Sequence, residues 1–383
     1  MLGAARVRRP DHSPAPTYSE SLPSEPCLAF GHMLPFGLGA FSILAMNSAS
    51  GTGNGAGNVK RKVWRLTLGI VGTMVAVAAA LGLGIWRAPL WVEVKLTEFQ
   101  LSHSGIYGHT MMIDGLQVHY LEGGSGTPVV LVHGLGSHAQ QDWSRLLPFL
   151  VQAGYHVYAM DLIGYGRSDK PTNWKYSISE EAEFVEAFMD AKQLPTVELA
   201  GVSMGGWIAA TVALQQPQRI TRLALFDSAG MTFKLSFDPL VFTPETTEQV
   251  DQLFAVVTNT PQKMPTFVKE DFIRKSKRNG WVVKRALTSM MTGTDVLDRR
   301  FSDLKMPLLI VWGKEDTLTP VEVGEAMHRL APQSELAVYD GCGHIAVVTC
   351  VERIAPTVVE FLGGGGKAGE AVEATAARGG DGR

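Results

Sequence analysis

A serine between two glycines stands where nucleophilic chemistry is possible. The segment GVSMG at 201–205 follows the mostly apolar stretch 197–200 and precedes an apolar stretch at 207–214. A short strand, a sharp turn and a helix form the context in which such a serine projects its hydroxyl at the edge of a sheet. The sequence therefore predicts that Ser203 is a nucleophile.

Two further residues supply what a serine nucleophile needs. A serine hydroxyl requires a positioned base, and the base requires a carboxylate that orients it. Asp316 ends the motif WGKED and His344 ends the motif DGCGH, and each motif follows a predicted strand. The order serine, acid, histidine along the chain is the one expected after this type of turn. Asp227 is the alternative acid, and Glu315 is a carboxylate next to the first candidate.

The negative oxygen that forms during attack on a carbonyl needs two preorganised N–H donors. The residue after the nucleophile, Met204, supplies one backbone N–H in this prediction. The loop HGLG at 133–136 supplies the other through Leu135. We expect His133 to be a structural residue that holds this loop.

The elements around these motifs predict an α/β fold. Asp114-Gly115 separates two strand-like segments and indicates a hairpin. Apolar strands then alternate with helices, which favours a mostly parallel, doubly wound sheet. The expected strands are 111–113, 116–121, 128–132, 155–160, 197–202, 220–226, 307–312 and, as the last one, 334–339.

The alternation stops between residues 227 and 305. Helical patterns at 248–254 and 267–291 fill this interval, which is too long for a simple loop. We expect a helical cap at about 231–304, inserted after the sixth strand. Its apolar opening, 233–242, either packs on the core or forms a surface for acyl chains or a membrane. The basic cluster Arg274, Lys275, Lys277 and Arg278 is expected to be a solvated helix face.

The N-terminal region predicts a membrane anchor. Residues 66–86 contain no charge and are long enough to cross a bilayer as a helix. Four basic residues at 60–65 precede this stretch, which predicts a cytoplasmic N-terminus and a catalytic domain on the outer side. A signal peptide cleaved near Ala78-Ala79-Ala80, giving a secreted protein, is the alternative.

The composition of both ends of the chain indicates that they lack regular structure. Residues 1–65 are predicted to be a flexible segment, and the Gly- and Ala-rich stretch 363–383 is predicted to be disordered. Met33 and Met46 are alternative starts of the natural protein.

Composition excludes several classes of protein. The chain has 383 residues and a net charge of −3, so nothing indicates a nucleic-acid partner. No metal or nucleotide motif is present, and no cofactor is expected. The three cysteines do not make a disulfide framework. Cys342 and Cys350 are expected to be buried free thiols, with pairing in an oxidising compartment as the alternative.

Five motifs occur in order along residues 108–362: HGLG, DLIGYGRS, GVSMGG, WGKED and GCGH. Through them the chain resembles the α/β-hydrolase superfamily. The anchor and the segments 308–316 and 342–348 are similar to membrane-anchored monoacylglycerol lipases and related bacterial lipases. The resemblance implies that Ser203, Asp316 and His344 form a catalytic triad and that the substrates are lipid esters.

Hydrolysis of carboxylic esters through an acyl-enzyme on Ser203 is therefore the leading hypothesis, with monoacylglycerols as the expected type of substrate. The alternatives are hydrolysis of a carbon–carbon bond in a ring-fission diketone and a general short-chain esterase. A non-catalytic binding protein is a third class, but such a protein would be expected to have lost one of the five motifs. The oligomeric state stays open.

Overall fold

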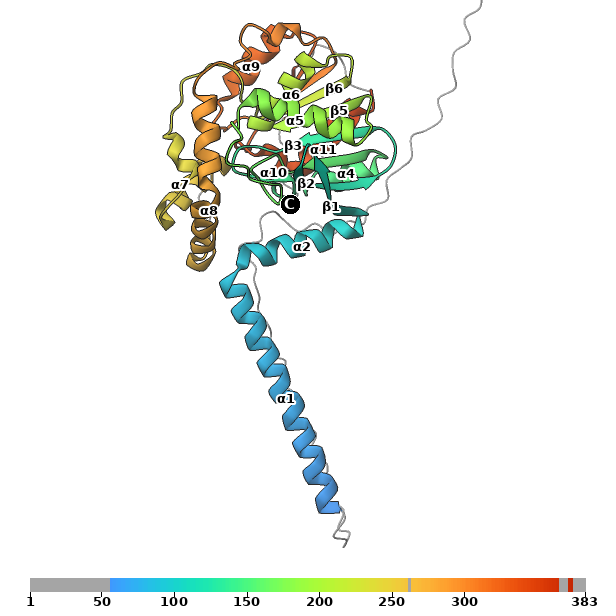
Figure 1. The fold of residues 1–383 in the computed structure, drawn as a ribbon, viewed down its shortest axis with the longest axis vertical. Helices are drawn as coiled ribbons and strands as arrows, with labels where there is room; N and C mark the ends of the chain where they lie inside the picture. Colours follow the sequence, from blue (N-terminus) through green and yellow to red (C-terminus); the bar gives the residue numbers. More distant parts are fainter. Residues whose placement is uncertain (1–55, 261–262, 365–370, 375–383) are drawn as a thin grey trace, which may run out of the picture.

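The computed structural model describes residues 56–260, 263–364 and 371–374. A long helix projects from a domain in which helices cover both faces of a sheet (Figure 1). The predictions for residues 1–55, including the alternative starts, lie outside the described residues.

The sheet contains nine strands in the order β1-β2-β4-β3-β5-β6-β7-β8-β9. β2 pairs antiparallel with β1 and with β4, and every other pair is parallel. The predicted mostly parallel sheet led by a hairpin is confirmed. The strands are β1 (Ile106–Ile113), β2 (Leu116–Gly124), β3 (Pro128–Val132), β4 (His156–Met160), β5 (Val197–Val202), β6 (Ile220–Phe226), β7 (Leu308–Gly313), β8 (Glu335–Tyr339) and β9 (Ala371–Ala374).

Two apolar layers hold the sheet between helices. One layer joins the sheet to α5 (Ile178–Ala191), α6 (Met204–Gln215) and α9 (Val321–Leu330). The other joins it to α3 (Ala139–Trp143), α4 (Leu147–Gln152), α10 (Ala346–Thr349) and α11 (Val351–Leu362). Because β3, β5 and β7 are buried on both faces, their residues are almost entirely apolar.

The helical cap lies between β6 and β7, as the sequence predicts. It comprises η1 (Pro239–Phe242), α7 (Thr247–Thr258), α8 (Thr266–Met290) and η2 (Phe301–Asp303). α7 begins with a capping box in which Thr246 and Gln249 exchange hydrogen bonds. In the apolar opening of the cap, Phe233 and Phe242 pack on the core, whereas Leu240 is 61% exposed.

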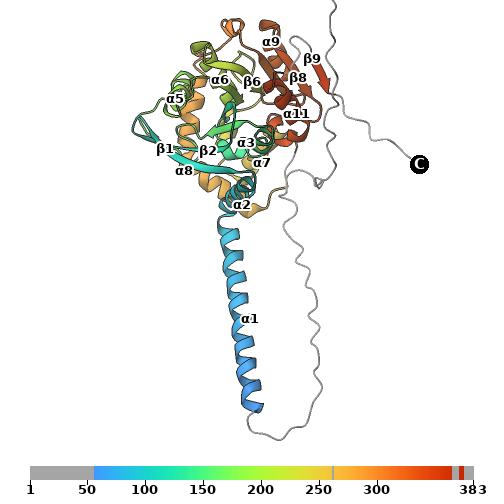
Figure 2. The ribbon, with the colours of Figure 1, turned by 90° about the vertical axis from the view of Figure 1, so that its right-hand side faces the viewer.

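The C-terminal region differs from the prediction. Residues 334–339 do not form the last strand, because β9 pairs in parallel with β8 at the edge of the sheet (Figure 2). Part of the stretch predicted to be disordered therefore satisfies the open backbone groups of β8. The Gly-rich composition around it conceals this pairing. Residues 365–370 and 375–383 lie outside the described residues.

The N-terminal helix α1 (Ala56–Arg87) contains the predicted apolar stretch 66–86. Its part Arg61–Arg87 has 27 residues and is long and apolar enough to cross a membrane. At about 1.5 Å per residue this length is roughly 40 Å. None of the apolar window is buried in the protein, and both views show α1 standing away from the domain (Figures 1 and 2). A second helix that the sequence did not predict, α2 (Pro89–His103), connects α1 to β1.

A buried carboxyl group on α5 predicts a pH-dependent stability. Glu181 is buried and accepts a hydrogen bond from the indole N–H of Trp174. Burial raises the pKa of Glu181 from an ordinary 4.5 to about 8. Between these values the folded protein holds a proton that the unfolded chain has released, so raising the pH favours unfolding.

We therefore expect the free energy of unfolding to fall by roughly 3 to 4 kcal/mol between about pH 5 and pH 8. In Glu181→Gln most of that dependence should disappear, as measured by urea denaturation in detergent. Glu183→Gln, exposed on the same helix, is the control and should keep the wild-type slope. Identical slopes in wild type and Glu181→Gln would contradict the assignment.

Candidate active site

Ser203 lies in a sharp turn between β5 and α6. Its φ of 54° and ψ of −120° place a non-glycine residue in a sparsely populated backbone conformation. Its backbone N–H donates to the carbonyl of Phe226 at the end of the neighbouring strand, and its carbonyl accepts from Ala229. These bonds to the end of β6 hold the strained turn at the point where α6 begins.

The flanking glycines are required by close backbone contacts. A Cβ on Gly201 would lie 2.2 Å from the carbonyl oxygen of Gly205, and a Cβ on Gly205 would lie 2.2 Å from that of Val132. Both distances are shorter than any real Cβ contact, so neither position accepts a side chain without moving backbone. The G-x-S-x-G pattern thus reflects packing of β5, α6 and β3 around Ser203.

The structure brings the three predicted residues together. His344 Nε2 lies 2.8 Å from Ser203 Oγ, and His344 Nδ1 lies 2.8 Å from Asp316 Oδ2. Asp316 follows β7 and His344 follows β8, so both loops meet Ser203 at the carboxyl edge of the parallel strands. His344 and Asp316 are buried, whereas Ser203 is partly accessible. This arrangement can transfer a proton from a serine hydroxyl to an oriented imidazole.

Thr319 is a contact that the sequence analysis missed. Its hydroxyl lies 2.8 Å from His344 Nδ1 and 3.0 Å from Asp316 Oδ2. The backbone N–H groups of Leu318 and Thr319 also donate to Asp316 Oδ1. A polar residue three positions after the acid, in the turn before α9, is the only sequence signal for it. Thr319 therefore orients both the imidazole and the carboxylate that pairs with it.

Asp227, the alternative acid, is used differently. Its two oxygens accept the backbone N–H groups of Gly313, at 2.7 Å, and Ala346, at 3.0 Å. Complete burial, together with the neighbouring Asp316, raises its pKa well above the ordinary value. Glu315 accepts the N–H groups of Gly341 and Cys342. Of the carboxylates weighed in the sequence, Asp316 is the one that contacts the imidazole.

The residue and the loop predicted to supply the oxyanion donors lie next to the serine. Met204 is the first residue of α6, so its N–H has no partner within that helix. A Cβ on Gly134 would lie 3.3 Å from Ser203 Cβ, which places the loop containing Leu135 against the serine. His133 holds this loop, since its Nδ1 bonds to the carbonyl of Gly134 and its Nε2 accepts the N–H of Leu162. That structural role is the one expected for His133.

The cap contacts the loop that carries His344 and the loop that carries Leu135. On one side, a Cβ on Gly343 would lie 2.9 Å from the backbone of Thr258 at the end of α7. On the other side, Gly136 lies near Val283 of α8. The cap helices therefore border the site at the histidine loop and at the predicted oxyanion loop.

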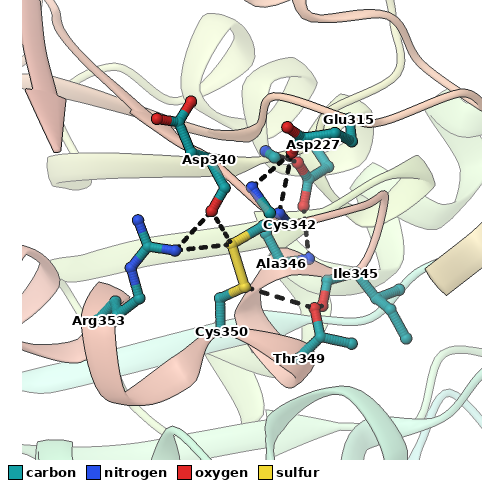
Figure 3. The surroundings of a disulfide bond; sticks show 11 residues. Asp227, Glu315, Asp340, Cys342, Ile345, Ala346, Thr349, Cys350 and Arg353 are labelled. Carbon is teal, nitrogen blue, oxygen red and sulfur yellow. Dashed lines mark hydrogen bonds between the residues drawn. A yellow bond between two sulfur atoms is a disulfide. The ribbon is translucent and has the colours of Figure 1, made fainter. Parts of the chain in front are cut away.

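A disulfide joins Cys342 to Cys350, so the expectation of free thiols is wrong. The Cα atoms are 6.2 Å apart because α10 folds the chain back between the two residues. Figure 3 shows the bond beside Arg353, whose guanidinium donates to the carbonyl of Asp340. The loop that it closes, residues 342–350, contains His344. The bond thereby restrains the segment that carries the imidazole.

Within the described residues, no group of three or more His, Cys, Asp or Glu side chains is arranged to hold a metal ion.

A strained serine turn on a parallel sheet, with a histidine and an aspartate at the same edge, defines an α/β hydrolase. The family model described as serine aminopeptidase, S33 matches residues 126–348. The chain belongs to this family of α/β hydrolases.

Several known proteins are similar to this chain. Lipase 1 of Psychrobacter immobilis is 25% identical over 284 residues, which cover 70% of this chain and 87% of the lipase. A 2-hydroxy-6-oxononadienedioate/2-hydroxy-6-oxononatrienedioate hydrolase of Paraburkholderia xenovorans is 28% identical and covers 64% of this chain and 91% of that protein. The crystal structure of a membrane phospholipase A, a bacterial virulence factor, matches with a TM-score of 0.67 and 29% identity, covering 78% of this chain and 98% of that one.

The contacts of Thr319 predict a positioning role. Thr319→Val keeps the shape of the side chain and removes its hydroxyl, which leaves His344 with a single partner at Nδ1. We expect fluorophosphonate labelling of Ser203 to slow by about tenfold, the scale of one lost hydrogen bond to a charged group. The pH at which labelling is half-maximal should also move.

Thr319→Ser retains the hydroxyl and should restore both the rate and the pH profile. If Thr319→Val merely slowed labelling through lower stability, the pH profile would keep its wild-type midpoint, and this role would be excluded.

The disulfide predicts a dependence on redox state. Replacing both Cys342 and Cys350 by Ala should lower the free energy of unfolding by about 2 kcal/mol, on the chain-entropy model for a short loop. Because the loop carries His344, labelling of Ser203 should also slow by about tenfold or more. A phosphine reductant should have the same effect on the wild type and none on the double variant. Unchanged labelling after complete reduction would refute the link to His344.

Proposed function

We propose that this chain is a membrane-anchored serine hydrolase that cleaves carboxylic esters of lipids. The observation that carries the proposal is the chain of contacts from Ser203 Oγ through both nitrogens of His344 to Asp316 Oδ2, each 2.8 Å long. Ser203 acts as nucleophile, His344 as base and then acid, and Asp316 steadies the imidazolium.

The reaction follows from this geometry. As Ser203 Oγ attacks the ester carbonyl, its proton passes to His344 Nε2. The N–H groups of Leu135 and Met204 stabilise the oxyanion of the tetrahedral intermediate. The intermediate collapses when His344 gives its proton to the departing alcohol, which leaves an acyl group on Ser203. Water then attacks the acyl-enzyme by the same steps and releases the acid.

Lipid esters are favoured as substrates by two independent features. The similar proteins include a lipase and a membrane phospholipase A. The phospholipase matches 78% of this chain, a larger share than residues 108–362 alone could supply. The similarity therefore includes part of the chain outside the catalytic domain. Independently of it, α1 is long and apolar enough to span a bilayer. An enzyme held at a membrane meets its lipid substrate without leaving the surface.

For the orientation, we propose a cytoplasmic N-terminus and a catalytic domain on the outer side. The basic residues Lys60, Arg61, Lys62 and Arg65 precede the apolar part of α1, and Arg87 follows it. Positive charge is enriched on the cytoplasmic side of a membrane helix. The Cys342–Cys350 disulfide fits a domain in an oxidising compartment. In this arrangement residues 66–86 form the anchor, 108–362 the catalytic domain and about 231–304 its cap.

Hydrolysis of a carbon–carbon bond is the second candidate, because the relative of Paraburkholderia xenovorans is named for a ring-fission product. Such enzymes and esterases share a serine site, so the test must compare the two kinds of substrate directly.

The proposal predicts turnover of long-chain esters by Ser203. The purified protein in detergent should hydrolyse monoacylglycerols and p-nitrophenyl esters of long acyl chains. Ser203→Ala should lower these rates by roughly 10⁴-fold or more and abolish fluorophosphonate labelling. Ser302→Ala, which changes an exposed serine of the cap, is the control and should behave as wild type.

The acyl-chain series also separates the alternatives. A preference restricted to C2–C4 chains without turnover of monoacylglycerols would indicate a general esterase. Rapid cleavage of a ring-fission diketone with no ester turnover would replace the proposal by the second candidate.

A further inference from the structure

The helix α2 has a second apolar face that no part of the described chain covers. Leu101 is buried in the domain core, and Leu90 packs against the cap. Trp91, Leu96 and Phe99 are 58%, 56% and 64% exposed. At 100° per residue these three side chains fall on one side of the helix, away from Leu90 and Leu101. Large apolar side chains gathered on one exposed face mark a surface that contacts a partner or a membrane.

The position of α2 next to the end of α1 indicates what covers this apolar face. α1 ends at Arg87 and α2 begins at Pro89, so a single residue separates the membrane-spanning length from α2. Figure 1 shows α2 running across the end of α1, between α1 and the domain. The first turn of α2 must therefore lie at the level where α1 leaves the bilayer. Tryptophan is the residue typical of that level.

The cap fixes the turn between the two helices. Asp271 of α8 accepts the N–H of Leu90, which is in the first turn of α2. Arg274 of α8 donates to the carbonyl of Arg87, the last residue of α1. Each charge suits the helix end that it meets, since an anion favours an N-terminus and a cation favours a C-terminus. Asp271 and Arg274 also form an ion pair with each other.

Part of the basic cluster on α8 therefore has a structural role at the turn between α1 and α2, and is not only the solvated helix face that the sequence predicts. An apolar cluster also stabilises this contact between the cap and α2. Leu90 packs with Val250 and Met264, and with aromatic residues of α7 and α8 that include Phe254 and Phe272. The cap, which borders the site at the loops of His344 and Leu135, is therefore attached to the membrane anchor and not only to the catalytic domain.

We propose that the face of α2 formed by Trp91, Leu96 and Phe99 lies in the lipid–water interface and that α8 holds the cap against it. Lys95 lies on the same side of α2, where its ammonium pairs with Glu98 at 2.7 Å, and its long apolar stem can lie along the lipid surface. This inference rests on the membrane anchor proposed above. It goes further in assigning a lipid-contacting surface outside α1 and in placing the cap, which borders the active site, next to the bilayer. A lipid molecule then reaches the site from the membrane surface without crossing bulk water.

The first experiment reads the position of α2 without using activity. Single cysteines replace Trp91, Leu96 or Phe99 in a Cys27→Ser background that keeps the disulfide, and each is labelled with the fluorophore NBD. The full chain is reconstituted in phosphatidylcholine vesicles. We expect blue-shifted emission, quenching by doxyl-labelled lipid and at least fivefold weaker quenching by aqueous iodide than at the control position.

The control is Arg329→Cys, an exposed position on α9, which Figure 1 places at the far end of the domain from α2. Iodide quenching at the three α2 positions equal to that of the control would overturn the proposal. Protection from both quenchers, together with crosslinking between chains through these cysteines, would also overturn it, because a second copy would then cover the face.

The second experiment compares a membrane substrate with a soluble one. In vesicles, Trp91→Asp/Phe99→Asp should lower turnover of an embedded monoacylglycerol by at least tenfold and leave turnover of soluble p-nitrophenyl acetate within twofold of wild type. Gln100→Asp, an exposed change elsewhere on α2, should leave both rates within twofold. Equal losses in Gln100→Asp, or equal losses on both substrates, would contradict a specific apolar contact.

Failure of this inference is distinguishable from failure of the proposed function. A wild type that hydrolyses neither ester refutes the ester hydrolase, while the fluorescence result still decides where α2 lies. Normal ester hydrolysis with an iodide-accessible α2 refutes the interface alone.

Discussion

The site depends on one buried carboxylate that binds two loops. Asp227 follows β6 and accepts the N–H of Gly313, at the end of β7, and of Ala346, at the start of α10. These two N–H groups lie three residues before Asp316 and two residues after His344. The distance between acid and base is therefore set by a third residue that touches neither substrate nor imidazole. A Cβ on Gly313 would lie 2.3 Å from the carbonyl of Gly343, so the loops have no room to slide past each other.

Asp227 and Asp316 are buried near each other, and their surroundings favour a negative charge on one of them more than on the other. Four donors converge on Asp316: two backbone N–H groups, the hydroxyl of Thr319 and the imidazole of His344. Asp227 receives two, and its pKa is raised by burial and by the charge of its neighbour. A negative charge is thus better placed at Asp316, beside the imidazole that must become positive. Separating the protonation of a close pair of carboxyl groups is a common way to give each a distinct role.

Most of the fold was predictable because the buried parallel strands show two local signals, an apolar run and a glycine-containing loop at its end. Buried parallel strands such as β3 and β7 are short apolar runs, and glycine-containing loops end them. Parallel strands deliver their carboxyl ends to one edge, so the loops of Ser203, Asp316 and His344 had to meet there. The glycines at 201 and 205 mark contacts with the neighbouring strand and with α6 that their spacing already indicates. Local pattern and global topology agree at these positions.

Other features depend on contacts between distant segments, which leave little pattern in the sequence. Thr319 contacts His344 only because the fold brings together the loops after β7 and β8. Cys342 pairs with Cys350 only because α10 turns the chain back. β9 is hidden in a Gly-rich stretch, since a four-residue edge strand needs only backbone pairing. α2 has apolar residues on all sides and therefore lacks the one-sided periodicity by which a surface helix is recognised.

The proposed position of α2 would account for this lack of periodicity. A helix between a protein and a bilayer has two apolar neighbours, so apolar side chains are needed on both of its faces and the contrast between them is small. Polar partners are then needed most at its ends, where backbone N–H and C=O groups lack partners within the helix. Asp271 and Arg274 supply them at the turn between α1 and α2. Both come from the cap, so the segment that borders the active site and the segment proposed to meet the membrane are stabilised by one set of contacts.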